Sequence, residues 1–227
     1  MTTIAENIRR LTGQIRELEQ LYERPIGSVK LLAVSKRHTI ESIIAASEAG
    51  IQDFGENYLQ EALDKIQKLS PIRANWHFIG PIQSNKTKPI AENFQWVHSV
   101  DRLKIAQRLS EQRGPSRPEL NVCVQINLSA EASKSGVALD EAKTLCDSIE
   151  ALPNLRLRGL MAIPAALPDI ESQRQSFRSL AIEFARIKTR YAQLDTLSMG
   201  MSNDFEAAIA EGSTLIRIGT AIFGPRD

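Results

Sequence analysis

The sequence predicts an α/β fold, a single (β/α)8 TIM-like barrel with one additional helix at its N-terminus. Short apolar segments alternate with amphipathic helical segments along the chain, and this alternation is typical of parallel strands joined by right-handed crossovers. Eight strand-like segments can be counted, which is the number that closes such a barrel. An open doubly wound sheet would share the alternation, but no glycine-rich dinucleotide loop follows the first strand-like segment.

The expected strands are short apolar runs bounded by polar or turn-forming residues, as is typical of strands buried on both faces. The first is VKLLAVSK and the last is TLIRIGTAIF. In chain order the expected strands cover residues 29–36, 51–55, 75–80, 94–100, 119–128, 155–163, 196–201 and 214–223.

The expected helices carry apolar residues at three- and four-residue spacing. The first spans residues 4–21, and the second is bounded by Thr39 as N-cap and Gly50 as C-cap. Asp101 is expected to cap the helix that follows the fourth strand. The helical segments after the first cover residues 39–50, 56–69, 85–94, 101–113, 138–152, 170–191 and 202–212. Because almost no chain follows the last strand, the opening helix is expected to cover the sheet where an eighth helix would lie.

Composition limits the classes of function. No linker or repeat divides residues 1–227, so one domain is expected, with residues 113–119 as a surface loop. The 28 basic and 27 acidic residues give a net charge of +1, which argues against nucleic acid or a membrane surface as a partner. No segment has the apolar length of a membrane span or the apolar core of a signal peptide, and we expect a cytoplasmic protein. Cys123 and Cys146 are expected to be buried, reduced thiols.

The candidate site lies where the strands end, because barrels of this kind carry their chemistry at the C-terminal ends of the strands. These ends bring together one amine with hydroxyls, amides and glycines: Ser35, Lys36, residues 54–57, Ile79, Gly80, Ser99, Asn127, Ile163, residues 199–202, Gly219 and Thr220. No set of His, Cys and carboxylate residues has metal-ligand spacing. His38, His77 and His98 are expected to be structural or rim residues, because no nucleophile is paired with them. No metal and no catalytic residue are therefore predicted.

Lys36 raises the first question, because the apolar run LLAVSK ends on a charged amine. It can mark the point where the strand reaches water, which is the usual place of a lysine. It can also be held at the lip of a pocket, where partial desolvation lowers the pKa of the amine and makes it a nucleophile.

Two segments together predict a phosphate site. SMGMSND (198–204) leads from a strand end into a helix start, whose free N–H groups and positive dipole end bind anions. RIGTAIFG (217–224) supplies Gly219 and Thr220 at the next strand end. Either segment alone is better explained without a ligand, by Ser202 as a simple N-cap and by glycines that only form turns, but the two segments at adjacent strand ends together favour phosphate. Phosphate is favoured because barrels often bind it in the loops after the seventh and eighth strands.

Arg217 lies within the last expected strand, where a guanidinium needs a partner because both faces are buried. It can form a salt bridge inside the barrel mouth, to Asp53 or Glu56, or it can donate to a ligand between Lys36 and the phosphate loops. An aldehyde-reactive lysine, a phosphate cradle and an arginine between them suit pyridoxal 5′-phosphate, held as a Schiff base on Lys36.

The same segments carry a family resemblance. LLAVSK, FGENYLQEALDK, WHFIGPIQSNK, SVDRLKIA, QINLSAEASKSGV, LRGLMAI and LSMGMSNDFEAAIAEGSTLIRIGTAIFG resemble the pyridoxal phosphate homeostasis protein family (YggS/PROSC type). The resemblance covers nearly the whole chain. It implies a barrel similar to the N-terminal domain of alanine racemase, without the second domain of that enzyme.

The resemblance also implies residue roles. The cofactor lysine falls on Lys36, and the arginine that faces the pyridine nitrogen falls on Arg217. Asn57 is a further cofactor contact. Phosphate contacts fall on Ser202 and neighbouring amides and on the last loop; the expected cofactor-binding residues of these loops are Ser198, Met199, Gly200, Met201, Ser202, Gly219 and Thr220.

The function implied is intracellular homeostasis of pyridoxal phosphate, a form of vitamin B6, and of amino- and keto-acid pools, by buffering or delivery. A carboxylate that faces the ring nitrogen keeps that nitrogen protonated, whereas an arginine can only donate to it, which makes the ring a weaker electron sink. No second domain is expected to supply an opposing acid or base. We therefore expect a non-catalytic, monomeric protein whose partners are the cofactor and apo-enzymes that accept it. A weak amino-acid racemase and a Schiff-base aldolase acting on a sugar phosphate are the alternatives. Lys134 is the first candidate for a second cofactor-reactive lysine.

Overall fold

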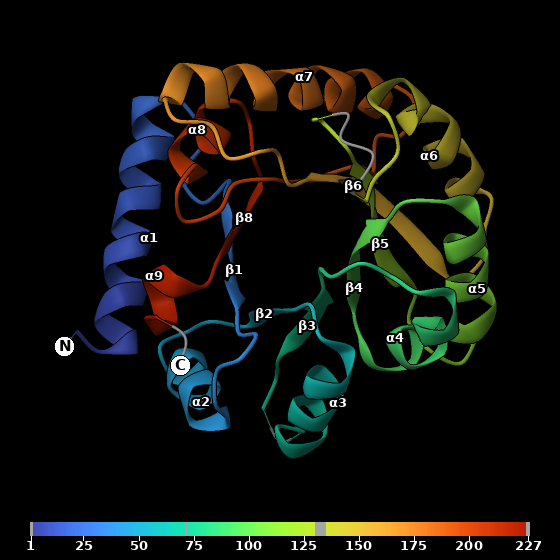
Figure 1. Ribbon diagram of the computed structural model, residues 1–227, viewed down its shortest axis with the longest axis horizontal. Helices are drawn as coiled ribbons and strands as arrows, with labels where there is room; N and C mark the ends of the chain where they lie inside the picture. The colour runs from blue at the N-terminus through green and yellow to red at the C-terminus, as the bar shows by residue number, and fades with distance from the viewer. Residues whose placement is uncertain (1, 71, 130–134, 226–227) are drawn as a thin grey trace.

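The strands form a closed parallel barrel. The computed structural model describes residues 2–70, 72–129 and 135–225. Its eight strands are hydrogen-bonded in chain order, and β1 pairs with β8 to close the barrel (Figure 1). This confirms the (β/α)8 architecture. The strands are β1 (Lys30–Val34), β2 (Asp53–Glu56), β3 (Asn75–Phe78), β4 (Trp96–Val100), β5 (Leu120–Ile126), β6 (Leu155–Ala162), β7 (Thr196–Ser198) and β8 (Leu215–Ile218).

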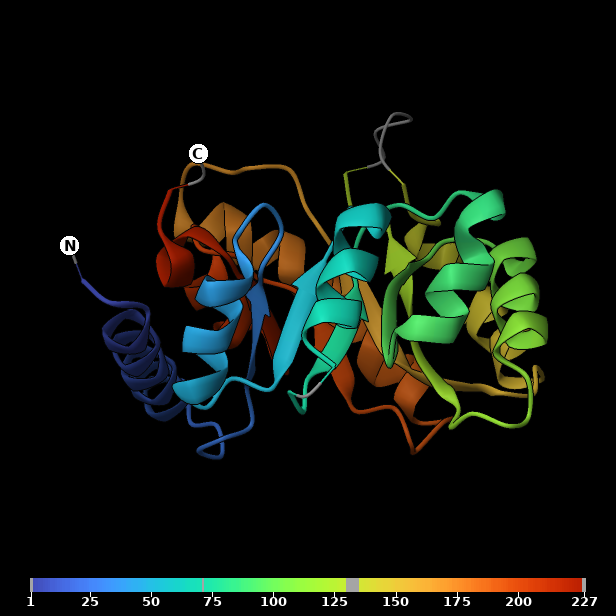
Figure 2. The same cartoon turned by 90° about the horizontal axis from the view of Figure 1, so that it is seen from below.

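Helices form the outer layer around the strands, as the side view shows (Figure 2). They are α1 (Ile4–Leu21), α2 (Ile40–Glu48), α3 (Leu59–Lys68), α4 (Thr87–Asn93), α5 (Leu103–Arg113), α6 (Ala142–Glu150), α7 (Ile170–Lys188), α8 (Phe205–Ala210) and α9 (Thr220–Phe223), with 3-10 turns η1 (Ser84–Lys86) and η2 (Leu139–Glu141). The four-residue helix α9 directly after the last strand was not predicted.

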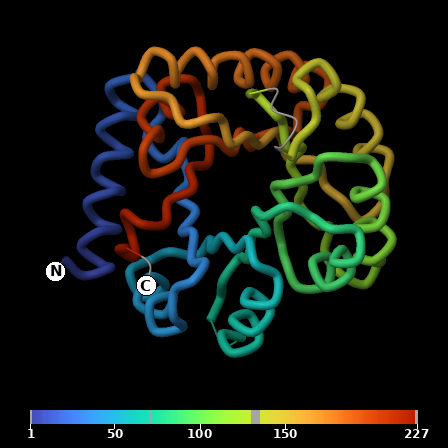
Figure 3. Tube along the Cα trace, viewed as in Figure 1, coloured from blue at the N-terminus to red at the C-terminus, as the bar shows by residue number. Residues whose placement is uncertain are grey.

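Helix α1 occupies the place that counting assigned to it. Thr3 and Glu6 form a reciprocal capping box at its start. The amide Nδ2 of Asn7 donates to the carbonyl oxygen of Ile222 at 3.0 Å, so the helix is fastened to α9. It runs alongside α9 and contacts α2 and α8 (Figures 1 and 3). The N-terminal helix therefore covers the barrel near the seam where β8 meets β1.

Two predicted helix starts behave differently. Thr39 caps α2 as expected, because its side chain accepts from the backbone N–H of Ser42, and Gly50 lies just beyond the end of the helix with φ of 97°. Asp101 does not cap α5. The N-cap position is Arg102, and the carboxylate of Asp101 instead accepts from the Arg102 guanidinium at 2.7 Å.

Other sequence expectations can be checked in the described residues. Cys123 and Cys146 are buried, free thiols. Among the helices of the described residues, none has the length and apolar character needed to cross a membrane. The apolar core lies between the barrel and its helices, whereas the interior of the barrel contains a buried polar cluster that includes His77, His98 and Arg217.

Candidate functional site

The predicted site residues come from four adjacent strands: Asn57 follows β2 (Asp53–Glu56), which pairs with β1, and the others lie on or after β1, β7 and β8. β8 pairs with β1 on one side and with β7 on the other. Lys36 lies in the turn after β1, half-buried, and Arg217 lies on β8. The two predicted phosphate segments follow β7 and β8. The lysine, the arginine and the phosphate segments are therefore brought to one part of the carboxyl-end mouth of the barrel.

A buried ion cluster fastens the residue before Lys36. The hydroxyl of Ser35 donates to Glu56 Oε1 at 2.7 Å. Lys65, on α3, donates from Nζ to the carbonyl oxygen of Ser35 at 2.7 Å and to Glu56 Oε1 at 2.8 Å. Burial raises the pKa of Glu56, and the charge of Lys65 opposes that rise. Lys65 thus joins α3 to the end of β1.

The residue after Lys36 is held by the same cluster. Glu61 Oε1 accepts from Lys65 Nζ at 2.6 Å and from the backbone N–H of Arg37 at 2.5 Å. The backbone of Arg37 has a φ of 61°, a region that non-glycine residues rarely occupy. The turn that presents Lys36 is therefore held on both sides. Sequence analysis missed Lys65, whose only local signal was the i,i+4 spacing from Glu61, which also occurs on exposed helix surfaces.

The end of β7 requires glycine at position 200. Gly200 has a φ of 97°, and a Cβ placed there would lie 2.6 Å from the Cβ of Ala208 on α8. The side chains of Ser198 and Met199 are fully buried just before it. Any contact that Met199 makes to a ligand would therefore come through its backbone.

The helix after this loop starts later than predicted. α8 begins at Phe205 with Asp204 as its N-cap, and Ser202 lies in the preceding turn. The N-cap role considered for Ser202 is therefore wrong. The backbone N–H of Met201 donates to Asp204 Oδ1 at 2.5 Å, and this bond closes the turn. It also engages the Met201 amide, so that group is not an open anion donor.

Several neighbouring groups remain open as donors to an anion. In residues 2–70, 72–129 and 135–225, the backbone amides of Ser202, Asn203, Gly219 and Thr220 donate no hydrogen bond. The side chain of Thr220 is exposed and that of Ser202 is half-buried. Hydroxyls and free amides are donors that a phosphate group accepts well. The donor set therefore fits a phosphate group.

Arg217 is buried, with 4% of its surface exposed. Its Nη1 donates to the carbonyl oxygen of Ser198 at 2.7 Å and to Ser198 Oγ at 2.8 Å, and its Nη2 donates to the carbonyl oxygen of Ala162 at 2.8 Å. The direct salt bridge to Asp53 or Glu56 is not formed, because those carboxylates contact His77 and Lys65. Burial lowers the pKa of Arg217 to about 10, so the guanidinium stays cationic at neutral pH.

Asn57 presents an open acceptor at the same mouth. Its side-chain oxygen is buried and has no hydrogen-bond partner within the described residues. It lines a cavity of about 460 Å³ together with Lys86 and Arg102. The adjacent Gly80 is packed so closely that a Cβ there would lie 2.4 Å from the carbonyl oxygen of Asn57. A buried carbonyl without a partner is costly unless a ligand or water donates to it.

The histidine pair inside the barrel was not predicted as a unit. His77 Nδ1 and His98 Nε2 lie 2.9 Å apart, and both side chains are buried. His77 also contacts Asp53, and His98 contacts Ser198. Nothing in the sequence joins residues on β3 and β4, because only the pairing of these strands brings the two rings together.

The expectations about a metal site and about Lys134 can be compared with the structure only within the described residues. Within them, no group of three or more His, Cys, Asp or Glu side chains could hold a metal ion. Lys134, the candidate second lysine, lies outside the described residues.

The comparisons with known proteins agree with this geometry. The family model described as "Alanine racemase, N-terminal domain" matches residues 7–227. A protein of Pseudomonas aeruginosa named pyridoxal phosphate homeostasis protein is 57% identical over 227 residues, which cover 100% of this chain and 97% of that protein.

Solved structures show the same likeness. PipY of Synechococcus elongatus is 34% identical, and the match covers 98% of this chain and 100% of PipY. The TM-score is 0.87 for PipY without pyridoxal phosphate and 0.84 for PipY with pyridoxal phosphate bound.

Proposed function

This chain belongs to the pyridoxal phosphate homeostasis protein family, built on the alanine racemase N-terminal domain, and we propose that it binds pyridoxal 5′-phosphate and buffers or delivers it. The cofactor is held as a Schiff base on Lys36, and the protein acts on the balance of free cofactor and of amino and keto acids. The names of the relatives support a role in pyridoxal phosphate homeostasis. The residue assignments rest on the site itself.

One observation carries the proposal. Three adjacent strands bring an amine, a buried guanidinium and a set of open backbone amides to one mouth. These are the groups that pyridoxal phosphate needs at its aldehyde, ring nitrogen and phosphate. Pyridoxal phosphate supplies an aldehyde that amines capture reversibly.

The site residues are assigned to different parts of the cofactor. Ser202 and Thr220 donate to the phosphate together with amides of their loops, Gly200 lets the β7 loop approach closely, and Arg217 donates to the ring nitrogen. Asn57 accepts from the cofactor at the rim. The backbone around Ser198, Met199, Met201 and Gly219 shapes the cradle for the phosphate.

Arg217 also favours a protein that carries the cofactor over an enzyme that uses it for catalysis. It donates N–H groups and is cationic at neutral pH, so it leaves the ring nitrogen unprotonated and the ring a weaker electron sink. Relatives that this chain matches over nearly their whole length are named homeostasis proteins, which supports the same proposal. We therefore propose a protein that holds the cofactor without rapid turnover.

Three narrower statements belong to the same proposal. The protein works in the cytoplasm, where thiols such as Cys123 and Cys146 stay reduced. Residues 1–227 act as a single, monomeric cofactor-binding domain. The partners are apo-enzymes that accept pyridoxal phosphate. Size-exclusion chromatography with light scattering tests the monomer, and a dimer mass at micromolar concentration would contradict it.

Reduction with borohydride tests the lysine assignment. Mass spectrometry of the reduced, digested protein is expected to find the cofactor on the peptide that contains Lys36. Lys36→Ala is expected to remain folded and to lose the visible absorbance of the bound cofactor. Lys104→Ala, an exposed lysine on α5, is the matched control and keeps that absorbance. Cofactor fixed on another lysine in Lys36→Ala, with the colour retained, would overturn the assignment.

Transfer and turnover separate the carrier from a racemase. The loaded protein is expected to activate an apo-enzyme that requires pyridoxal phosphate, while chiral analysis of several L-amino acids detects negligible racemisation. Turnover at about 1 per second or faster that disappears in Lys36→Ala would replace the carrier with a racemase.

A further inference from the structure

A continuous chain of hydrogen bonds crosses the interior of the barrel. It begins at Arg217 on β8, whose Nη1 lies 2.8 Å from Ser198 Oγ on β7. Ser198 Oγ lies 2.9 Å from His98 Nδ1 on β4, and His98 Nε2 lies 2.9 Å from His77 Nδ1 on β3. His77 Nε2 lies 3.0 Å from Asp53 Oδ1 on β2. We call this set of five side chains the interior relay.

The chemistry of the two ends fixes the direction of every bond. A carboxylate only accepts, so His77 Nε2 must carry the proton that it shares with Asp53. Neutral His77 then accepts at Nδ1 from the N–H of His98 Nε2. His98 accepts at Nδ1 from the hydroxyl of Ser198, and Ser198 Oγ accepts from Arg217, which only donates. Each link has one donor and one acceptor.

The surroundings keep both rings neutral. Burial lowers the pKa of His77 and lowers that of His98 well below its usual value. At His77 the contact with Asp53 opposes this lowering of the pKa and the charge of Lys30 adds to it. At His98 the charge of Arg217 adds to the lowering. A proton added to His77 would place two N–H donors face to face within the pair, and a proton added to His98 would place an N–H against the Ser198 hydroxyl that donates to it. The relay therefore has one arrangement of protons around neutral pH.

The charge of Asp204 favours the cationic form of Arg217 against the effect of burial, and the relay links the same guanidinium to a second carboxylate, Asp53. The cation at one end and the anion at the other are joined by three neutral groups, each of which is polarised in the same sense. The guanidinium has five N–H groups, and three of them are used by Ser198 and Ala162. Two have no partner in the part of the chain that the structure describes, and their direction depends on how Ser198 is held.

We propose that His77 and His98 are positioning residues that aim Arg217 at the ring nitrogen of the cofactor, an inference that rests on the proposed binding of pyridoxal phosphate. His98 holds the hydroxyl of Ser198 in the rotamer that accepts from Arg217. His77 holds His98 in the tautomer that this requires, and Asp53 holds His77. The relay thus connects the cofactor mouth to a carboxylate on the far side of the barrel.

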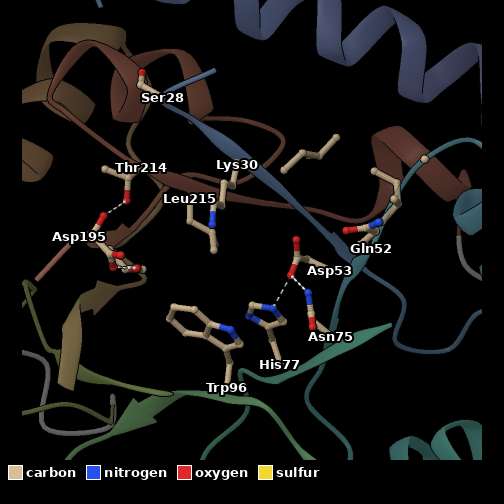
Figure 4. A pocket seen from close by; sticks show the side chains of 14 residues that line it. Ser28, Lys30, Gln52, Asp53, Asn75, His77, Trp96, Asp195, Thr214 and Leu215 are labelled. Atoms are coloured by element: carbon tan, nitrogen blue, oxygen red, sulfur yellow. Dashed lines mark hydrogen bonds and ion pairs between the residues drawn. The ribbon is translucent and has the colours of Figure 1, made fainter. Parts of the chain in front are cut away.

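The far end of the relay opens at the amino-end mouth. Asp53, His77 and Trp96 face a pocket of about 620 Å³ there, and the side chain of Asp53 is 29% exposed (Figure 4). Trp96 stacks on His77 with ring centroids 5.3 Å apart, which fixes the plane of that ring. Asp53 can therefore be changed without touching a residue that is proposed to contact the cofactor.

The pocket also supplies a matched control. Asn75 donates from Nδ2 to the same Asp53 oxygen at 3.0 Å but is not a link of the relay. Asp53→Ala removes the terminal acceptor of the relay, whereas Asn75→Ala removes a neighbouring hydrogen bond of similar length. His98→Leu breaks the relay in the middle, and His98→Gln offers one acceptor and one donor in its place.

The experiment compares two ligands by equilibrium titration: pyridoxal phosphate and its 1-deaza analogue, in which C–H replaces the ring nitrogen. Asp53→Ala and His98→Leu are expected to weaken binding of pyridoxal phosphate about tenfold, the cost of a misplaced hydrogen bond from a charged donor, and to leave binding of the deaza analogue unchanged. His98→Gln recovers part of the loss, and Asn75→Ala changes neither affinity. An equal loss for both ligands in Asp53→Ala, or no loss for either, would overturn the proposal.

A second measurement needs no cofactor and remains informative if a variant fails to fold. Nitrogen-15 NMR of the histidine rings in the unloaded wild-type protein is expected to show His77 and His98 neutral, with the proton on Nε2, from about pH 6 to pH 8. A proton on Nδ1 of either ring would overturn the relay. If the wild type binds neither ligand, the proposed function fails, and the NMR result still decides whether the relay exists.

Discussion

Replacing Lys65 by methionine tests how the turn at Lys36 is held. The substitution keeps the length of the side chain and removes the ammonium that contacts the carbonyl of Ser35 at 2.7 Å and Glu56 at 2.8 Å. Glu56 is fully buried, and its second oxygen has no hydrogen-bond partner in the described part of the chain. The variant therefore leaves a buried carboxylate without its cation.

The expected loss of stability follows from these contacts. Breaking a buried ion pair by removing one partner costs about 3–5 kcal/mol. Most of this loss arises at Glu56, because Glu61 is partly exposed, with 28% of its side chain accessible, and its contact to Lys65 is screened by water. For a protein of this size the loss corresponds to a fall in Tm of roughly 6–20 °C.

The loss is expected to depend on pH in a defined direction. Burial already raises the pKa of Glu56 in the folded protein, so the folded state favours the protonated acid. Stability is therefore lost as the pH rises from the unfolded pKa through the folded pKa. Without Lys65 the pKa of Glu56 in the folded state rises further. Each additional pKa unit costs about 1.4 kcal/mol of stability at a pH above the folded pKa. Lys65→Met is thus expected to destabilise more at pH 8 than at pH 5.

Urea denaturation at pH 5 and pH 8 measures this effect. The double variant Lys65→Met with Glu56→Gln is expected to recover at least half of the loss at pH 8, because glutamine carries no charge and can still accept from Ser35. The reasoning is refuted if the loss at pH 8 is below about 1 kcal/mol, is equal at both pH values, or is not relieved by Glu56→Gln.

Three further predictions concern the β7 and β8 loops and the thiols. Gly200→Ala is expected to lower the free energy of unfolding by about 2–5 kcal/mol, because a positive φ and an overpacked contact with α8 each carry a cost; urea denaturation at pH 7 checks it, and an unchanged midpoint would contradict it. Ser202→Ala and Thr220→Ala are each expected to weaken pyridoxal phosphate roughly tenfold or more and to leave pyridoxal unchanged, which titration of both ligands tests; equal losses for the two would argue against phosphate contacts. Cys123 and Cys146 are expected to resist alkylation in the native protein at pH 8 and to react in urea, since burial raises the pKa of both thiols, that of Cys146 to about 12; mass spectrometry counts the adducts, and rapid native labelling would refute it.

The candidate site was partly accessible to sequence reasoning. Lys36, the glycine at position 200 and the loop that contains Thr220 follow apolar runs, and the ends of parallel strands meet at one mouth of a barrel. The start of α8 was misplaced, because Ser202 and Asp204 are both good N-cap residues. The backbone bond from the Ala208 N–H to the Asp204 carbonyl oxygen, the first of the helix, places the N-cap at Asp204 and not at Ser202.

The sequence by itself determined the eight-strand barrel, the cap at Thr39 and the position of Lys36 at a strand end, because these features depend on hydrophobic period and on neighbouring residues. The partners of Lys65 and Arg217 were decided only by the tertiary structure. Lys65 binds Ser35 across the gap between α3 and β1, and Arg217 is joined to Asp53 through side chains on three other strands. Such contacts depend on strand register and on closure of the barrel, which bring together side chains that no local pattern in the sequence relates.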